Sequence, residues 1–113
     1  MGAHYEPDGS GVVFRLASTR ATRVELWIYD APMGGERSRI VMEREAGNAW
    51  RARVPASELP ETIYYGYRVW GPNWMFDDAW TPGSMAGHVA DVDAQGNRMN
   101  PNKLVFDPYA REL

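Results

Sequence analysis

The sequence lacks cysteine throughout its 113 residues, which excludes disulfide bonds, thiolate metal sites and thiol nucleophiles. It also lacks any apolar run approaching the roughly 18 residues that a membrane-spanning helix requires. Positive charge is not in excess, because 12 Lys and Arg residues stand against 15 Asp and Glu residues, a formal net charge of -3. A polyanion therefore finds no strongly basic surface here. We expect neither a membrane nor a nucleic acid among the partners of this protein.

The first eight residues lack the basic and apolar regions of a signal peptide. We therefore expect a soluble protein in the cytoplasm. At 113 residues the chain has the size of one domain, long enough to bury about two-thirds of its unfolded surface without metal ions or disulfides. A single domain over residues 1–113, with one hydrophobic core, is the expectation.

Motifs that carry catalytic chemistry are also missing. The sequence has no glycine-rich phosphate loop, no nucleophile elbow and no paired histidines at helical spacing. His4 and His88 are isolated, and because a zinc site needs three or four convergent ligands, structural roles are favoured for both. Asp77 and Asp78 are adjacent, whereas glycoside cleavage needs two carboxyl groups that face each other across a sugar at about 5 Å or more. We expect no cofactor, no metal ion and no catalytic residue in this chain.

Residues 91–97 resemble the opening of a calcium-binding loop, with oxygen donors at alternate positions and a glycine at the sixth. The resemblance ends at Asn102, which stands where such a loop requires a bidentate glutamate. An Asx turn, in which a side-chain oxygen accepts hydrogen bonds from nearby backbone N–H groups, is the favoured interpretation of this stretch.

The strongest strand signal lies within residues 62–74, where β-branched and aromatic side chains follow one another almost without interruption. Side chains alternate between the two faces of a strand. One face holds Ile63, Tyr65, Tyr67 and Val69, and we expect it in the core. The other holds Tyr64, Gly66, Arg68 and Trp70, and we expect it to be suited to a flat, hydroxylated ligand.

Shorter strands are predicted at residues 12–16, 24–30, 39–45, 50–54 and 103–107. Among these, 24–30 alternates as a half-buried strand does, 39–45 and 50–54 form a predicted hairpin, and residues 56–59 allow one helical turn. No segment shows sustained helical periodicity, so the fold class is all-β, an antiparallel β-sandwich. A long irregular loop, about residues 72–101, precedes the last strand, and a segment of this kind usually serves function or an interface.

Five tryptophans exceed what one small core usually requires. Trp27 and Trp50 lie in clear strands, and we interpret both as structural. Around the irregular segment lie Trp70, Trp74, Phe76 and Trp80. For these rings, burial in the protein and exposed stacking against a sugar are equally open from sequence, since an aromatic face suits the apolar face of a pyranose.

Two stretches carry a resemblance to a known family. They are Tyr64-Tyr-Gly-Tyr-Arg-Val-Trp-Gly-Pro-Asn-Trp74 and the segment from Gly87-His-Val-Ala-Asp to Leu-Val-Phe-Asp-Pro-Tyr-Ala110. Both resemble the N-terminal domain of isoamylase and related glycogen debranching enzymes. The resemblance implies an immunoglobulin-like β-sandwich, classed among carbohydrate-binding modules of family 48, placed ahead of a glycoside hydrolase family 13 barrel. That barrel would hydrolyse α-1,6 linkages of glycogen or amylopectin with its own Asp and Glu, which lie outside the matched region.

For individual residues the resemblance implies less. In glycogen-binding relatives, such as the β subunit of AMP-activated protein kinase, sugar is held by a loop tryptophan, a strand lysine and a second tryptophan. Here the strand position is Gly66, the loop at 30–35 has no tryptophan, and Trp74 matches the second one. The candidates for contact with carbohydrate or with the barrel are Arg68, Trp70, Trp74, Phe76 and Trp80.

The favoured function is therefore a non-catalytic module that packs against its own catalytic barrel and helps to present branched α-glucan. The alternative is a module that binds α-glucan by itself, and a secreted parent enzyme is an alternative to a cytoplasmic one. Without the barrel, we expect residues 75–96 to be mobile or to bury their aromatic rings against a second molecule, because exposed apolar patches seek partners. Full burial of Trp74, Phe76 and Trp80 within one chain would count against the expected interface.

Overall fold

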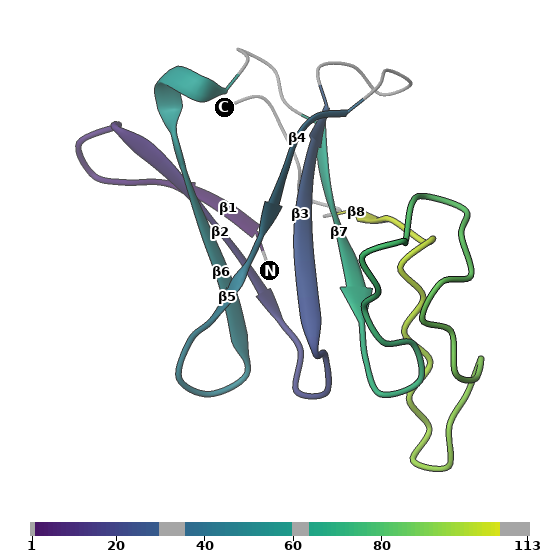
Figure 1. The fold of residues 1–113 in the computed structure, drawn as a ribbon. Coiled ribbons are helices and arrows are strands. Elements are labelled where there is room, and N and C mark those ends of the chain that lie inside the picture. The colour runs from purple at the N-terminus through teal and green to yellow at the C-terminus, as the bar shows by residue number, and fades with distance from the viewer. Residues whose placement is uncertain (1, 30–35, 60–63, 107–113) are drawn as a thin grey trace.

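Two antiparallel four-stranded sheets pack face to face in the computed structural model, which describes residues 2–29, 36–59 and 64–106 (Figure 1). The elements in chain order are β1 (Gly2–Tyr5), β2 (Gly11–Ala17), β3 (Arg23–Tyr29), β4 (Glu36–Val41), β5 (Glu43–Arg44), β6 (Ala49–Pro55), the 3₁₀ helix η1 (Ala56–Glu58), β7 (Tyr64–Trp70) and β8 (Val105–Phe106). Sheet A has the order β1-β2-β6-β5, and sheet B the order β4-β3-β7-β8. The predicted all-β sandwich is confirmed. Within the described residues no helix has the length and apolar character to span a membrane.

The core between the sheets follows the alternation of the strands. Val24, Leu26 and Ile28 of β3 are almost fully buried and contact inward residues of β2 and β6. Tyr65 and Tyr67 of β7 lie in the same cluster, with exposures of 2% and 0%. The core face predicted for β7 is confirmed, with Val69 packed at its edge; Ile63 lies outside the described residues.

The stretch 39–45 is not one strand, because the chain crosses from sheet B to sheet A within it. β4 pairs with β3, whereas β5 pairs with β6 through only two residue pairs, Glu43 with Arg51 and Arg44 with Trp50. Met42 lies between the two strands and is 3% exposed in the core. Within the predicted strand 39–45, the predicted pairing with 50–54 is therefore correct only for Glu43 and Arg44. The residues that follow Met42, Glu43-Arg44-Glu45, are all charged and do not alternate, so the sequence pattern does not reveal the change of sheet.

Strand β1 was not predicted. It pairs antiparallel with β2, from Gly2 opposite Arg15 to Tyr5 opposite Val12. The turn between them is closed by a hydrogen bond from Gly9 N to Glu6 O, and Gly9 has a φ of 73°, which favours glycine. The Pro7-Asp-Gly9 sequence is typical of a turn, and here it ends β1 and leads into β2.

The long irregular loop covers the outer face of sheet B. Figure 1 shows this segment beside β7, on the opposite side of sheet B from sheet A. Because of this cover, the outward side chains of β3 are buried as well, with Glu25 at 5% and Trp27 at 3% exposure. The prediction of a half-buried β3 is therefore wrong. Alternation reports the local pattern only, and the burial here is produced by residues some 50 positions later in the chain.

Candidate functional site

Four tryptophans form a second buried cluster on the outer face of sheet B. Trp27 and Trp70 come from β3 and β7, and Trp74 and Trp80 come from the loop that covers them. The Trp70 ring meets the Trp80 ring edge to face at 5.0 Å between centroids, and Trp27 meets Trp80 in the same way at 6.2 Å. Phe76 is half-buried against Trp70 at 5.4 Å. Each edge-to-face pair contributes about 0.5 to 1.5 kcal/mol beyond burial, so the rings fix the loop on the sheet.

Arg68 lies among these rings and is 7% exposed. Its guanidinium carbon is 4.2 Å from the centre of the Trp27 ring, and its Nη1 donates a hydrogen bond to Pro101 O at 2.7 Å. Three buried nitrogen atoms, Arg68 Nε, Trp70 Nε1 and Trp80 Nε1, have no hydrogen-bond partner within the described part of the chain. A buried charge is costly unless its environment compensates, and here the ring faces provide part of that compensation.

Glu25 provides the negative charge of this region. It accepts hydrogen bonds from Trp27 Nε1 at 3.0 Å and from Arg23 Nε at 2.9 Å. The Arg23 guanidinium lies 3.7 Å from the centre of the Phe76 ring, so one carboxylate positions both an indole and a stacked cation. A small cavity with a volume of about 170 Å³ lies beside these groups, and Asp78 is among the residues at its rim.

A short ladder holds the loop together around Trp74. Trp74 pairs with His88 in an antiparallel bridge, their rings meet at 4.7 Å, and Trp74 Nε1 donates to Ala86 O at 3.0 Å. His88 Nε2 lies 2.9 Å from Asp91 Oδ1, so this histidine contacts a ring and one carboxylate. Among the described residues no group of three His, Asp or Glu side chains is arranged to hold a metal ion.

Asn73 is the centre of the loop, and it is 0% exposed. Its Nδ2 donates to Ala90 O at 3.0 Å and to Met99 O at 2.8 Å, while its Oδ1 accepts from Met99 N at 3.0 Å. One amide side chain therefore joins three parts of the loop. Sequence reasoning missed this residue; its place directly after the Gly-Pro turn that ends β7 was the only available signal.

The structure brings all of the predicted site residues together, but it turns the large rings inward. All five tryptophans of the sequence are described, and their exposures lie between 0% and 6%. Trp70, Trp74 and Trp80 are buried within a single chain, as is Arg68, and Phe76 is half-buried. Trp74 and Trp80 are therefore buried without a second molecule, contrary to expectation, and this counts against the expected interface for these two rings, whereas Phe76 is only half-buried. The predicted suitability of the outer face of β7 for a flat ligand is not met, since loop residues cover it.

The segment that covers sheet B packs tightly against β7 at Gly66. A Cβ atom added to Gly66 would lie 2.7 Å from Leu104 Cγ, closer than real contacts allow. A side chain at the strand position that carries lysine in glycogen-binding relatives therefore has no room here. The loop at residues 30–35, where those relatives carry a tryptophan, lies outside the described residues.

Four large apolar side chains of the loop are exposed to solvent. Trp74 is buried, whereas Met75 and Val89, diagonal neighbours across the bridge that joins Trp74 to His88, are exposed. Met75 is 46% exposed and Val89 63%. Met85 and Val92 are 59% and 46% exposed in the same segment. We call these four residues the outer apolar face.

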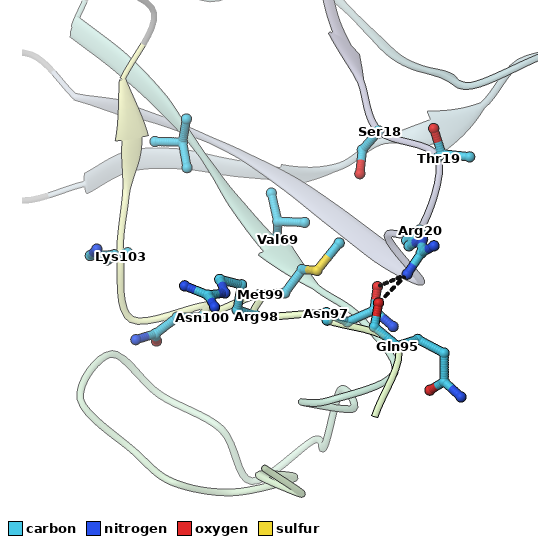
Figure 2. Close-up of a pocket in the computed structure, with 12 residues that line it drawn as sticks. Ser18, Thr19, Arg20, Val69, Gln95, Asn97, Arg98, Met99, Asn100 and Lys103 are labelled. Atoms are coloured by element: carbon cyan, nitrogen blue, oxygen red, sulfur yellow. Dashed lines mark hydrogen bonds between the residues drawn. The ribbon is translucent and has the colours of Figure 1, made fainter. Parts of the chain in front are cut away.

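A larger pocket lies at the other side of the loop, between the turn that joins β2 to β3 and residues 95–105 (Figure 2). Its volume is about 650 Å³. Arg20 closes one end, since its Nη1 donates to Gln95 O at 2.8 Å and to Asn97 Oδ1 at 3.3 Å. Of the residues that line this pocket, the sequence analysis considered as a possible binding site only Gln95, Gly96 and Asn97, which belong to the possible calcium loop.

Residues 91–97, the possible calcium loop, form an Asx turn, as predicted. Asp93 Oδ1 accepts hydrogen bonds from the backbone N–H groups of Gln95 at 3.0 Å and Asn97 at 2.9 Å, and Asp93 Oδ2 accepts from Asn97 Nδ2 at 2.8 Å. These bonds, the one from the Asn97 side chain foremost, hold the pKa of Asp93 below its usual value. The turn is thus a rigid support for the pocket wall.

Comparison with known proteins agrees with this fold. The family model "Carbohydrate-binding module 48 (Isoamylase N-terminal domain)" matches residues 1–110. The chain belongs to this family. An isoamylase of Flavobacterium sp is 46% identical over 121 aligned residues, and that of Pseudomonas amyloderamosa is 44% identical over 119, each match covering 100% of this chain. The chain spans only 16% and 15% of the lengths of these two relatives.

Solved structures place the same module within larger enzymes. A pullulanase from Bacillus acidopullulyticus matches with a TM-score of 0.55 and 24% identity over 64% of this chain and 8% of the other, which supports the fold alone. A pullulanase from Paenibacillus barengoltzii, solved with maltohexaose and alpha-cyclodextrin, matches with a TM-score of 0.53 and 25% identity over 63% of this chain and 10% of the other. The resemblance seen in the sequence is therefore confirmed as membership of the module 48 family.

Proposed function

We propose that this chain is a non-catalytic N-terminal module of an isoamylase-type debranching enzyme, an α-1,6-glucosidase that acts on glycogen or starch. The module packs against the catalytic barrel of that enzyme and helps to present branched α-glucan to it. The curated relatives that match the whole chain are isoamylases, and they extend far beyond the matched part. The cytoplasmic location expected from sequence stays a prediction.

One observation carries the choice of an interface over a sugar platform. The loop places its tryptophans against sheet B and its apolar aliphatic side chains in solvent. A sugar-stacking site needs an exposed aromatic face, and none of the five tryptophans offers one. Exposed apolar patches rimmed by polar residues mark contacts with other protein surfaces. The outer apolar face is therefore our candidate for the contact with the barrel.

The predicted site residues act in this proposal from beneath the contact surface. Trp70, Trp80 and Arg68 hold the loop in place, and Trp74 fixes the ladder that carries Met75 and Val89 outward. Of the original candidates, half-buried Phe76 is the one that retains accessible ring surface. Direct contact with the barrel or with glucan is proposed for Phe76, beside the Asp78 rim, and for the outer apolar face.

Autonomous binding of α-glucan is the alternative, and titration separates the two. We expect the isolated chain, titrated with maltoheptaose and with glycogen, to give no saturable heat by calorimetry and no quenching of tryptophan emission. Saturable binding with quenching would favour the alternative. The same preparation should release no linear chains from amylopectin, because catalysis is assigned to the barrel.

The interface itself is tested in the longer enzyme. Backbone amides of residues 75–92 should exchange hydrogen more slowly there than in the isolated chain. The double variant Met75→Ser/Val89→Ser should abolish that added protection, whereas Tyr5→Ser, which changes a 49% exposed residue of β1 in sheet A, should retain it. Equal exchange of residues 75–92 in the two proteins would refute the proposed contact.

A further inference from the structure

The pocket between the β2–β3 turn and residues 95–105 has an unbalanced positive charge. Three cationic side chains line it, Arg20, Arg98 and Lys103, and no carboxylate is among its lining residues within the described part of the chain. This concentration is unexpected in a protein of net charge -3. An anion is the ligand that such a lining favours.

The three cations are not equivalent. Arg20 is already committed, because it donates to Gln95 O and Asn97 Oδ1, and its charge is one of the influences that lower the pKa of the Asp93 carboxyl. The side chains of Arg98 and Lys103 form no hydrogen bond and no ion pair with the residues that the structure describes. In Figure 2 they lie with Asn100 at the end of the pocket opposite Arg20. The uncompensated charge is therefore at one end.

A rigid turn positions that end. Lys103 N donates to Asn100 O at 3.0 Å, and Asn100 Oδ1 accepts from Asn102 N at 2.9 Å. Pro101 within the turn is buried, and its carbonyl is held by Arg68 at 2.7 Å. Arg98 and Lys103 therefore project from a backbone that is tied to the aromatic cluster, so this backbone loses little conformational entropy when a ligand binds.

The rest of the lining suits a sugar. Neutral amide and hydroxyl groups are provided by Gln95, Asn100, Ser18 and Thr19, and an apolar floor by Val69, Met99 and Val105. Amides and hydroxyls both donate and accept hydrogen bonds, as sugar hydroxyls require. The volume of about 650 Å³ lies within the range of about 300 to 1,000 Å³ that is usual for small-molecule sites. No aromatic ring lines the pocket to supply stacking.

We propose that this pocket binds a glucosyl phosphate monoester, either a free hexose phosphate or a phosphate-bearing residue of an α-glucan chain. Arg98 and Lys103 hold the phosphate, and the amide and hydroxyl groups between them and Arg20 hold the sugar hydroxyls. The proposal rests on the carbohydrate context of the proposed function, and charge replaces the stacking that the buried tryptophans do not offer. It concerns a surface separate from the outer apolar face.

The test is a titration of the isolated chain followed by backbone amide NMR and calorimetry. The four probes are glucose 6-phosphate, a 6-phosphorylated maltooligosaccharide, neutral maltotriose and inorganic phosphate. Both phosphorylated sugars should give saturable shifts at residues 95–105 at millimolar concentration, and maltotriose should give none. Tighter binding of the phosphorylated maltooligosaccharide than of glucose 6-phosphate would identify a glucan chain as the source, and the reverse order a free hexose phosphate.

Substitutions locate the charge. Arg98→Gln and Lys103→Gln should each weaken binding by about tenfold, as expected for loss of a charge-assisted hydrogen bond. Arg51→Gln removes the same charge from β6, outside the pocket lining, and should leave the affinity unchanged. Far-ultraviolet circular dichroism and melting temperature of each variant establish that it folds.

The proposal is overturned if glucose 6-phosphate gives no saturable shift, if Arg51→Gln weakens binding as much as Arg98→Gln, or if inorganic phosphate binds as tightly as the phosphorylated sugars. Its failure is distinguishable from failure of the proposed function. The latter depends on neutral maltoheptaose and on protection of residues 75–92, neither of which involves the phosphate probes.

Discussion

Replacement of Asn73 tests whether one buried amide holds the long loop. Asn73→Ala removes a donor to Ala90 O and Met99 O and an acceptor for Met99 N, at bond lengths of 2.8 to 3.0 Å. No water replaces these bonds easily, since Asn73 is 0% exposed. Asn73→Asp keeps the size of the side chain but replaces the donating amide group with an oxygen that faces two carbonyl oxygens.

The expected cost follows from these contacts. Each hydrogen bond contributes about 0.5 to 1.5 kcal/mol net, and a buried group left without a partner costs about 1 to 3 kcal/mol. For three bonds we expect Asn73→Ala to lower the free energy of unfolding by about 3 kcal/mol, a large share of the roughly 5 to 15 kcal/mol usual for a domain. Asn73→Asp should cost more than Asn73→Ala, because it adds a buried charge whose second oxygen faces the carbonyl oxygens of Ala90 and Met99 and has no hydrogen-bond donor.

Urea denaturation measures both effects. The midpoint for Asn73→Ala should fall by about 1 M or more, given slopes of about 1 to 3 kcal/mol/M. Tryptophan emission should shift to the red before the far-ultraviolet circular dichroism is lost, because Trp74 and Trp80 lie in the loop. Asn100→Ala, which removes one exposed hydrogen bond, is the control and should shift the midpoint little. A midpoint for Asn73→Ala equal to that of the control, or a milder effect of Asn73→Asp, would refute the reasoning.

Two further predictions follow from the loop and from the β1–β2 turn. Gly87→Ala places a Cβ atom 1.9 Å from Met75 O at a φ of 82°, whereas Gly83→Ala has a φ of 91° and no neighbour within 4 Å. We expect Gly87→Ala to lower the melting temperature clearly more than Gly83→Ala, and equal losses would contradict the clash. The hydrogen bond from Arg53 holds the pKa of Glu6 below the usual 4.5. A depressed carboxylate pKa stabilises the fold above the unfolded-state pKa, and this contribution is lost as the pH falls through the folded-state pKa. Stability should therefore fall less steeply below pH 4.5 in Arg53→Gln than in the wild type, and parallel melting curves across pH would contradict this.

Alternation of side chains predicted the strands and the inner core because each strand buries one face against the opposite sheet. The inward sets of β3 and β7 could be identified from sequence for this reason, and Tyr67 is 0% exposed as expected. Side-chain alternation does not predict the strand pairing on either side of Met42. Residues before it pair with β3 and residues after it pair with β6, and the all-charged stretch Glu43-Arg44-Glu45 has no alternation that would show this change of sheet.

The sequence predicted which residues form the candidate site, but not whether their side chains face solvent or the protein interior. Clustering of aromatic residues around the irregular segment correctly indicated that Trp70, Trp74 and Trp80 act together. Whether their rings face a ligand or the protein depends on the path of the loop, which Asn73 determines through bonds to residues 17 to 26 positions away. A single asparagine has no periodicity, so no sequence pattern distinguishes it from an ordinary turn residue.

Gly66 links the burial of the tryptophans to the docking of the loop on β7. In β7 the outward face can either carry a side chain that reaches a ligand or receive a covering segment, but it cannot do both. Glycine at this position permits Leu104 to approach until an added Cβ would be 2.7 Å from Leu104 Cγ. The same covering segment buries the indoles and continues into the wall of the phosphate pocket through the turn at Asn100. Glycine at position 66 therefore leaves room for the loop to pack on β7. The docked loop supplies both of the surfaces to which we assign function.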